Sequence, residues 1–247
     1  MFEVIEFYLS LSTCMLISLV KELEYGTVND IGYCPIALYE DETSLYLAYV
    51  TPGDSEFAVT TIDSDLQTNP DCMKCENKWG MIMHIRLFSR SQKMFALVGY
   101  ESGDIGVWVV GRNGRLLNAV HAHNDPVMCL DIDTKSCQSI SGSADDILQV
   151  LRLDDDLQLH YHFSRDSVTS GFACTCVRGD GSIVVCGGWD GKLRLFGWRK
   201  MKPLAILKFH AETVNAVSFS RDNLFAAGSK DGRITIWDVY KEYGNKK

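Results

Sequence analysis

Short apolar runs separated by polar turns recur along this chain, and each run has the length of a β-strand. In the clearest unit, residues 214–220, 224–229 and 233–239 are three such runs, and Asp231 and Gly232 lie just before the third. An Asp-Gly pair supplies the positive φ angles that a tight hairpin turn requires. The pattern therefore predicts three antiparallel strands joined by short turns.

The same plan occurs in three preceding units, each with a fourth run that predicts an outer strand. The runs are residues 83–89, 94–100, 104–110 and 115–122, then 127–133, 139–143, 147–153 and 157–163, then 172–178, 182–188, 192–198 and 203–209. Residues 31–39, 45–50 and 56–62 form a further, degenerate unit that lacks the glycine and tryptophan markers of the others. The strands are apolar on both faces, so no unit can bury its own surface, and neighbouring units must stack.

Four glycines mark equivalent positions in these units and are separated by 43, 45 and 41 residues. The glycines and the large apolar residues nine positions after them are Gly99 and Trp108, Gly142 and Leu151, Gly187 and Phe196, and Gly228 and Trp237. The third residues after the glycines are Ser102, Asp145, Asp190 and Asp231. A period of about 40–45 residues with four strands per unit indicates a WD40 β-propeller.

We therefore predict an all-β chain whose residues 30–240 form a WD40 β-propeller with about five recognisable blades. Residues 1–29 form an N-terminal apolar segment, and residues 241–247 a polar tail. The last unit lacks an outer strand, for which residues 3–10 are the candidate that would close the ring. Five units are fewer than the seven of most WD40 domains, which leaves a smaller ring, a ring without its first blades or an open ring.

The composition of the chain limits the classes of binding partner and the cellular locations that we expect. The net charge of −8 argues against a general phosphate-binding surface, so we do not expect direct binding of nucleic acid. Residues 7–20 form an apolar run of 14 residues, shorter than the roughly 20 of a membrane span and preceded by acidic rather than basic residues. Nine cysteines, mainly in predicted strands, indicate reduced thiols. We expect no membrane association and a cytoplasmic or nuclear location.

Several stretches resemble one family within the WD40 repeats, the G-protein beta-subunit-like and ASTRA-associated proteins. The stretches are residues 123–133, 139–146, 187–210 and 225–240, of which 187–190 and 198–210 are the most specific. The resemblance implies a non-enzymatic adaptor for protein partners. It further implies work with the co-chaperone assembly that stabilises phosphatidylinositol-3-kinase-like kinases or, in fungi, with a chromatin-linked complex.

The resemblance also implies a hydrogen-bonded tetrad of His, Ser or Thr, Trp and Asp within a blade. The last unit has His210, Asp231 and Trp237, but Ala227 stands at the hydroxyl position. An earlier unit has His123, Ser141 and Asp145, but Leu151 replaces the tryptophan, and Cys186 and Val98 replace the hydroxyl residue in the other two. We therefore expect no complete tetrad in any blade, and packing that depends mainly on apolar burial.

Two sites are candidates for contact with a protein partner. Trp189 lies in a turn where the other units have Glu101, Ala144 and Lys230, so its indole is expected to be exposed. The alternative is that the indole covers a neighbouring loop. Trp198, Arg199 and Lys200 begin the one compact basic cluster, on the loop between the third and fourth strands, where it could meet an acidic partner segment or nucleic acid. The alternative is a solvated loop, which is the usual state of such charge runs.

Metal binding and catalysis find weaker support in the sequence. The pairs His121 and His123, and His160 and His162, could share a strand face, and Cys72 with Cys75 adds a single CxxC. The acidic residues 154–156 lack the glycine and terminal glutamate of a calcium loop. No hydrolase elbow, phosphate loop or dinucleotide fingerprint occurs, so we predict no metal, no cofactor and no enzyme activity. A metal-dependent hydrolase on a propeller and a truncated product with little function of its own stay open as alternatives, as does a small-molecule ligand.

Overall fold

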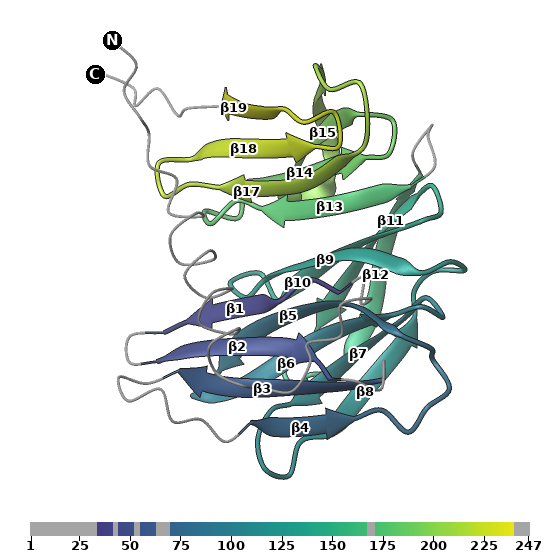
Figure 1. Cartoon of the computed structure of the whole chain (residues 1–247), viewed down its shortest axis with the longest axis vertical. Coiled ribbons are helices and arrows are strands. Elements are labelled where there is room, and N and C mark those ends of the chain that lie inside the picture. Colours follow the sequence, from purple (N-terminus) through teal and green to yellow (C-terminus); the bar gives the residue numbers. More distant parts are fainter. Residues whose placement is uncertain (1–33, 42–43, 52–54, 63–69, 167–170, 240–247) are drawn as a thin grey trace.

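The computed structural model describes residues 34–41, 44–51, 55–62, 70–166 and 171–239. These residues form five separate antiparallel sheets, which we name blades A to E in chain order (Figure 1). Blades A to D have four strands each and blade E has three. The prediction of an all-β propeller with about five blades is confirmed. No helix among these residues is both long and apolar enough to cross a membrane.

The strand bounds follow the predicted runs closely. Blade A contains β1 (Ala37–Glu40), β2 (Leu45–Val50), β3 (Glu56–Ile62) and β4 (Asp71–Lys74). Blade B contains β5 (Ile82–Arg90), β6 (Lys93–Tyr100), β7 (Asp104–Val109) and β8 (Arg115–His121). Blade C contains β9 (Val127–Asp133), β10 (Gln138–Ser143), β11 (Ile147–Leu153) and β12 (Leu159–Asp166). Blade D contains β13 (Phe172–Val177), β14 (Ile183–Gly188), β15 (Lys192–Gly197) and β16 (Lys202–Lys208), with a 3-10 turn η1 (Trp198–Lys200) before β16, and blade E contains β17 (Val214–Phe219), β18 (Leu224–Ser229) and β19 (Ile234–Asp238).

Within each blade the strands are hydrogen-bonded in chain order, so every sheet is a simple meander. The tight turns are where the sequence predicted them. Gly232 after Asp231 has φ +77°, and Gly191 after Asp190 has φ +73°, a backbone region that glycine adopts without steric cost. The degenerate first unit forms a complete blade A, to which β4 adds an outer strand that the apolar pattern did not predict.

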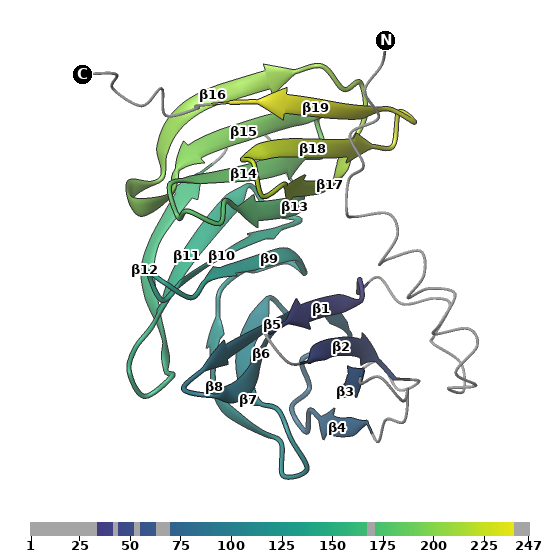
Figure 2. The ribbon, with the colours of Figure 1, turned by 90° about the vertical axis from the view of Figure 1, so that its left-hand side faces the viewer.

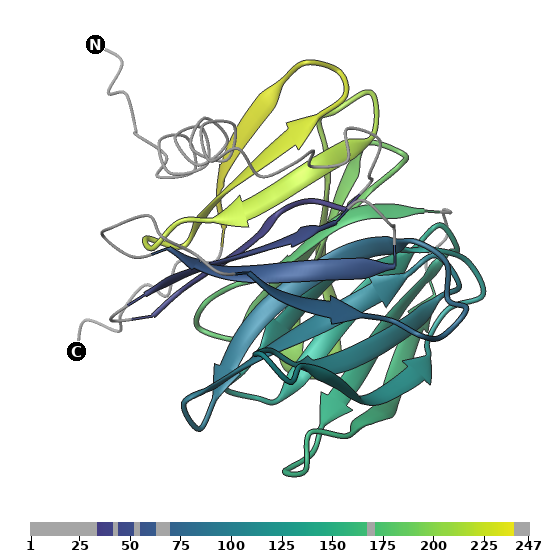
Figure 3. The same ribbon diagram turned by 60° about the horizontal axis from the view of Figure 1, so that its bottom comes forward.

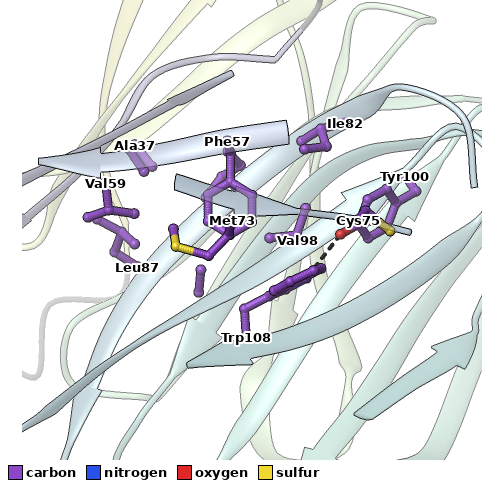
Figure 4. Packing of buried hydrophobic residues seen from close by; sticks show 13 residues of the cluster. Ala37, Phe57, Val59, Met73, Cys75, Ile82, Leu87, Val98, Tyr100 and Trp108 are labelled. Atoms are coloured by element: carbon purple, nitrogen blue, oxygen red, sulfur yellow. Dashed lines mark hydrogen bonds between the residues drawn. The ribbon is translucent and has the colours of Figure 1, made fainter. Parts of the chain in front are cut away.

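Neighbouring blades pack through their first strands, which lie innermost: β1 beside β5, β5 beside β9, β9 beside β13 and β13 beside β17. Figure 2 shows the sheets following one another from blades A and B to blades D and E. Between blades A and B the buried core includes Phe57 and Trp108, whose rings meet edge to face at 5.7 Å (Figure 4). This stacking gives each blade the burial that it cannot provide alone.

The repeated glycines make room for this stacking. A Cβ atom on Gly142 would lie 2.7 Å from Phe172 of blade D, and one on Gly187 would lie 2.9 Å from Val214 of blade E. Gly99 stands in the same relation to Val127 of blade C, at 2.6 Å. Only a residue without a side chain fits there, because interiors tolerate no such overlap.

The five sheets do not close into a ring among the described residues: blade E and blade A are the two ends of the array (Figures 1 and 3). The predicted closing strand in residues 1–29 and the whole polar tail, residues 241–247, lie outside the described residues. Those predictions stay open.

Candidate protein-interaction face

The polar markers that the sequence singled out lie at one end of blades B to E, where the second strand turns into the third, whereas the large apolar markers pair near the opposite end of the third strand. In blade C, the Nδ1 atom of His123 donates to the Asp145 carboxylate at 3.0 Å, and its Nε2 atom lies 2.8 Å from the Ser141 hydroxyl. Burial lowers the pKa of His123, which the neighbouring Asp145 only partly offsets. The ring is therefore neutral at pH 7, and it fixes the β10–β11 turn against the segment that leads into blade C.

Blade E contains a complete four-residue network, contrary to the expectation that no blade would. His210 contacts Asp231 through Nδ1 at 3.1 Å and the Thr235 hydroxyl through Nε2 at 3.0 Å. Trp237 donates its indole N–H to the same hydroxyl at 2.8 Å. Thr235 lies directly opposite Ala227 in the β18–β19 pairing, so the hydroxyl is supplied from the neighbouring strand. The sequence reasoning missed Thr235 because it searched only the Ala227 position.

Blade D holds its turn aspartate with a different residue type. Arg194 donates to Asp190 from both terminal nitrogens, at 3.0 and 2.9 Å, and Lys192 donates at 2.8 Å. Burial opposes the charge of Asp190, but the hydrogen bonds from Arg194 and Lys192 outweigh it and hold the pKa of the carboxyl well below its usual range. Arg194 occupies the same place in its unit as Thr235, seven residues after the glycine, and this equivalence is the signal that could have found both.

Blade B replaces the network with other polar groups. The Ser102 hydroxyl donates to Asp104 at 2.6 Å, and Trp108 donates its indole N–H to the Tyr100 hydroxyl at 3.0 Å (Figure 4). Tyr100 thus supplies the hydroxyl that Val98 lacks. Blades B, D and E therefore pair the polar groups of their turns by different residues, whereas in blade C the buried Oε1 atom of Gln149, seven residues after Gly142, has no hydrogen-bond partner among the described residues.

These turns are joined to the segments between the blades by a continuous series of hydrogen bonds, which we call the loop belt. Its bonds run from Ala122 N to Gly103 O, Ala144 N to Pro126 O, Gly171 N to Asp145 O, Trp189 N to Gly171 O, Thr213 Oγ1 to Trp189 O and Lys230 N to Thr213 O. They connect blades B, C, D and E along one face of the array. The loops of this face consequently form one surface instead of four independent ones.

Trp189 lies in the loop belt between the turns of blades C and E, and its side chain is among the exposed large apolar groups, at 41% exposure. The indole also lies across the backbone of Gly171, where a Cβ atom would overlap its ring. Both readings of Trp189 thus hold in part: it covers a neighbouring segment and still presents a large aromatic surface.

The basic cluster lies at the opposite end of blade D, after β15, so the structure does not bring it together with Trp189. Arg199 and Lys200 are exposed there. Trp198 is fully buried, and its indole N–H donates to Asp133 of blade C at 3.0 Å. As a contact residue Trp198 was therefore predicted wrongly: it joins two blades.

The candidate metal ligands are dispersed. His121 is exposed and His123 is buried, so the two do not share a face, while His160 donates to Asp154 at 2.7 Å. Cys72 is exposed and Cys75 is buried. Within the described ranges, no three His, Cys, Asp or Glu side chains are grouped so that they could hold a metal ion.

Stacked antiparallel meanders of four strands, or three in blade E, with a turn aspartate in blades C, D and E define a WD40-repeat β-propeller. Residues 159–197 and 201–238 match the family model described as WD domain, G-beta repeat. The chain therefore belongs to the WD40-repeat proteins.

Two kinds of relative are similar to it. Guanine nucleotide-binding protein subunit beta-like protein 1 of Mus musculus is 34% identical over 217 residues, which cover 86% of this chain and 66% of the mouse protein. ASTRA-associated protein 1 of Schizosaccharomyces japonicus is 27% identical over 259 residues, covering 94% of this chain and 70% of the relative. The protein of the same name in Schizosaccharomyces pombe is 25% identical over 245 residues, covering 86% and 66%. The chain thus spans about two thirds of the length of these relatives.

Proposed function

We propose that this protein is a non-enzymatic scaffold that binds protein partners on its loop belt, with Trp189 as the central contact. The observation that carries the proposal is the exposed indole of Trp189 on a surface that hydrogen bonds join across four blades. Exposed tryptophan on a preorganised surface is typical of the few residues that dominate an interface. The names of the relatives support a role within a larger assembly.

The more specific part of the proposal concerns the partner. By resemblance, the partner is the co-chaperone assembly that stabilises phosphatidylinositol-3-kinase-like kinases, or an ASTRA-type, chromatin-linked complex. A cytoplasmic or nuclear location belongs to the same proposal. Affinity purification of the tagged protein followed by mass spectrometry tests it: recovery of kinase-maturation subunits supports this partner, and their absence leaves only the scaffold role.

Two variants test which face binds. Trp189→Lys should reduce the amount of co-purified partner at least tenfold while the far-UV spectrum stays as in the parent. The matched control is the pair Arg199→Glu and Lys200→Glu at the opposite end of blade D, which should leave capture unchanged. The proposal fails if Trp189→Lys captures the partner as well as the parent does, and capture lost only in the control pair would assign binding to the basic loop.

A further inference from the structure

Blade E exposes apolar positions that every equivalent blade buries. The sixth residue after the repeat glycine is 0%, 0% and 1% exposed in blades B, C and D, at Ile105, Leu148 and Leu193. In blade E the same position is Ile234, which is 77% exposed. The eighth residue after the repeat glycine shows the same difference: Val107, Val150 and Leu195 are 0% exposed, whereas Ile236 is 48% exposed. The difference does not lie in the sequence of blade E, which has the same residue types.

The difference lies in what covers the sheet. In blades B, C and D, a Cβ atom on the repeat glycine would collide with the first strand of the next blade. At Gly228 no described atom lies within 4 Å of that position. Blade E therefore keeps the form of a surface that receives a neighbour, and no described residue occupies the neighbour's place.

We call this surface the terminal face and define it by the two rows that the strand register aligns. Ala216, Gly228 and Ile234 form one row, and Ser218, Ala226 and Ile236 form the other. Small residues form its floor and two isoleucines its border, and none of the six is charged. An occupant must therefore be apolar and must project side chains toward Gly228, as Val127, Phe172 and Val214 do toward the other three glycines.

The chain contains one stretch with this chemistry that lies outside the described residues. Residues 7–20 include no Asp, Glu, Lys or Arg. Contact between them and the terminal face would remove apolar surface of both from water, which is favourable. They precede blade A, which is the other end of the unclosed array. The 13 residues between 20 and 34 can extend about 45 Å, at roughly 3.3–3.6 Å per residue, which is ample to cross from one blade to another.

We propose that residues 7–20 cover the terminal face and supply the apolar contacts that the next blade's first strand supplies in blades B, C and D. The proposal concerns the face of the sheet that contains Gly228, Ile234 and Ile236. It is distinct from closure of the ring by a strand paired to the edge of β19, which the sequence predicts for residues 3–10. It also goes beyond the proposed function, because the terminal face does not include Trp189.

Cross-linking in the full chain tests the proposal, because Cys14 lies in the middle of residues 7–20. With Cys72→Ser as background, Ile236→Cys should give an intramolecular product with a short bis-maleimide, joined to Cys14 as mapped by peptide mass spectrometry. The matched control is Ile206→Cys on β16 of blade D, a similarly exposed isoleucine outside the terminal face. We expect at least a tenfold higher yield of the Cys14 product from Ile236→Cys than from Ile206→Cys.

A second measurement covers the case in which the two thiols are badly aligned. Leu11→Lys together with Leu16→Lys should raise the rate at which a maleimide labels the Ile236→Cys thiol about tenfold, and should leave the Ile206→Cys thiol unchanged. Cross-links between chains would overturn the proposal in favour of a second copy. Equal yields at the two positions, with labelling that is insensitive to the lysines, would also overturn it. Partner capture through Trp189 is expected to persist in every outcome.

Discussion

Blades D and E hold the same turn aspartate by different chemistry. Asp190 in blade D is held by the guanidinium of Arg194, whereas Asp231 in blade E is held by His210, which Thr235 and Trp237 support in turn. Both solutions use the third strand of the blade at the same position, seven residues after the glycine. What blades D and E share is a donor for the turn carboxylate, and not a particular set of residues.

Arginine and buried histidine at these turns differ in how they respond to pH and to substitution. An arginine stays charged at all accessible pH values, so the blade D pair changes only when Asp190 takes up a proton. Histidine changes its charge near neutrality, and a buried neutral histidine opposes that change. We therefore expect blade D to be sensitive to loss of one residue, and blade C, where burial lowers the pKa of His123, to be the more sensitive to mild acid.

The largest expected effect is that of Arg194→Met. Because the side chain of Arg194 is buried and pairs with a largely buried carboxylate, its loss should lower the free energy of unfolding by about 3 kcal/mol. Urea denaturation at pH 7 measures this loss. Arg199→Met, at an exposed position in the same blade, should change it by less than about 0.5 kcal/mol. Similar values for the two variants would show that the Arg194–Asp190 pair adds nothing to the stability of blade D.

The second prediction concerns pH between about 7 and 5. Burial, with a smaller contribution from Arg86, lowers the pKa of His84 to about 3, and burial also lowers the pKa of His123. Below about pH 6.5 these histidines become protonated in the unfolded chain but stay neutral in the folded one. The free energy of unfolding therefore falls as pH falls. At pH 5 the His84 contribution to this loss is about 2 kcal/mol.

Urea denaturation across this range, compared with His84→Leu, measures the His84 contribution. In this variant the slope of the unfolding free energy against pH should be smaller by about 1.4 kcal/mol per pH unit, which corresponds to one proton. The cost of Arg194→Met should stay constant over the same range, because the lowered pKa of Asp190 keeps its contribution intact until pH falls below the ordinary carboxyl range. An unchanged slope in His84→Leu would contradict the assignment.

The third prediction moves the hydroxyl of blade E between strands. Thr235→Val removes the group that both His210 and Trp237 contact, and should cost about 1–2 kcal/mol. Adding Ala227→Ser places a hydroxyl on β18, where Ser141 lies in blade C, and should recover at least half of the loss. Thermal and urea unfolding of the single and double variants test this. If the double variant is no more stable than Thr235→Val, the two positions are not equivalent.

The smallest effect is expected for Lys192→Met. Lys192 donates to Asp190, but its side chain is about one third exposed, so water already weakens the interaction. We expect a loss of about 0.5 kcal/mol, measured against the parent in the same urea series. A loss as large as that of Arg194→Met would mean that the two cations contribute equally to blade D.

The propeller was predictable because the residues that repeat with its period are the ones that packing between blades requires. Gly142 and Gly187 lie where the next blade leaves no room for a side chain, so spacing alone located the blades. Thr235 and Arg194 were missed because a hydrogen-bond partner can come from the opposite strand, and a search at one fixed position cannot see that. Trp198 was misplaced because its environment includes Asp133 of another blade. Contacts between units are not encoded in the pattern within one unit.

The order of the strands has a consequence for how this protein folds during synthesis. Every strand in the described part of the chain pairs with the strand just before or after it, so each of these sheets can form as soon as its own forty or so residues have left the ribosome. Each completed blade then presents its surface to the next one to emerge, so this topology allows assembly in order from blade A to blade E. The entropy cost of loop closure is therefore divided into small steps, and none of the described strands needs a distant partner before its sheet begins to form.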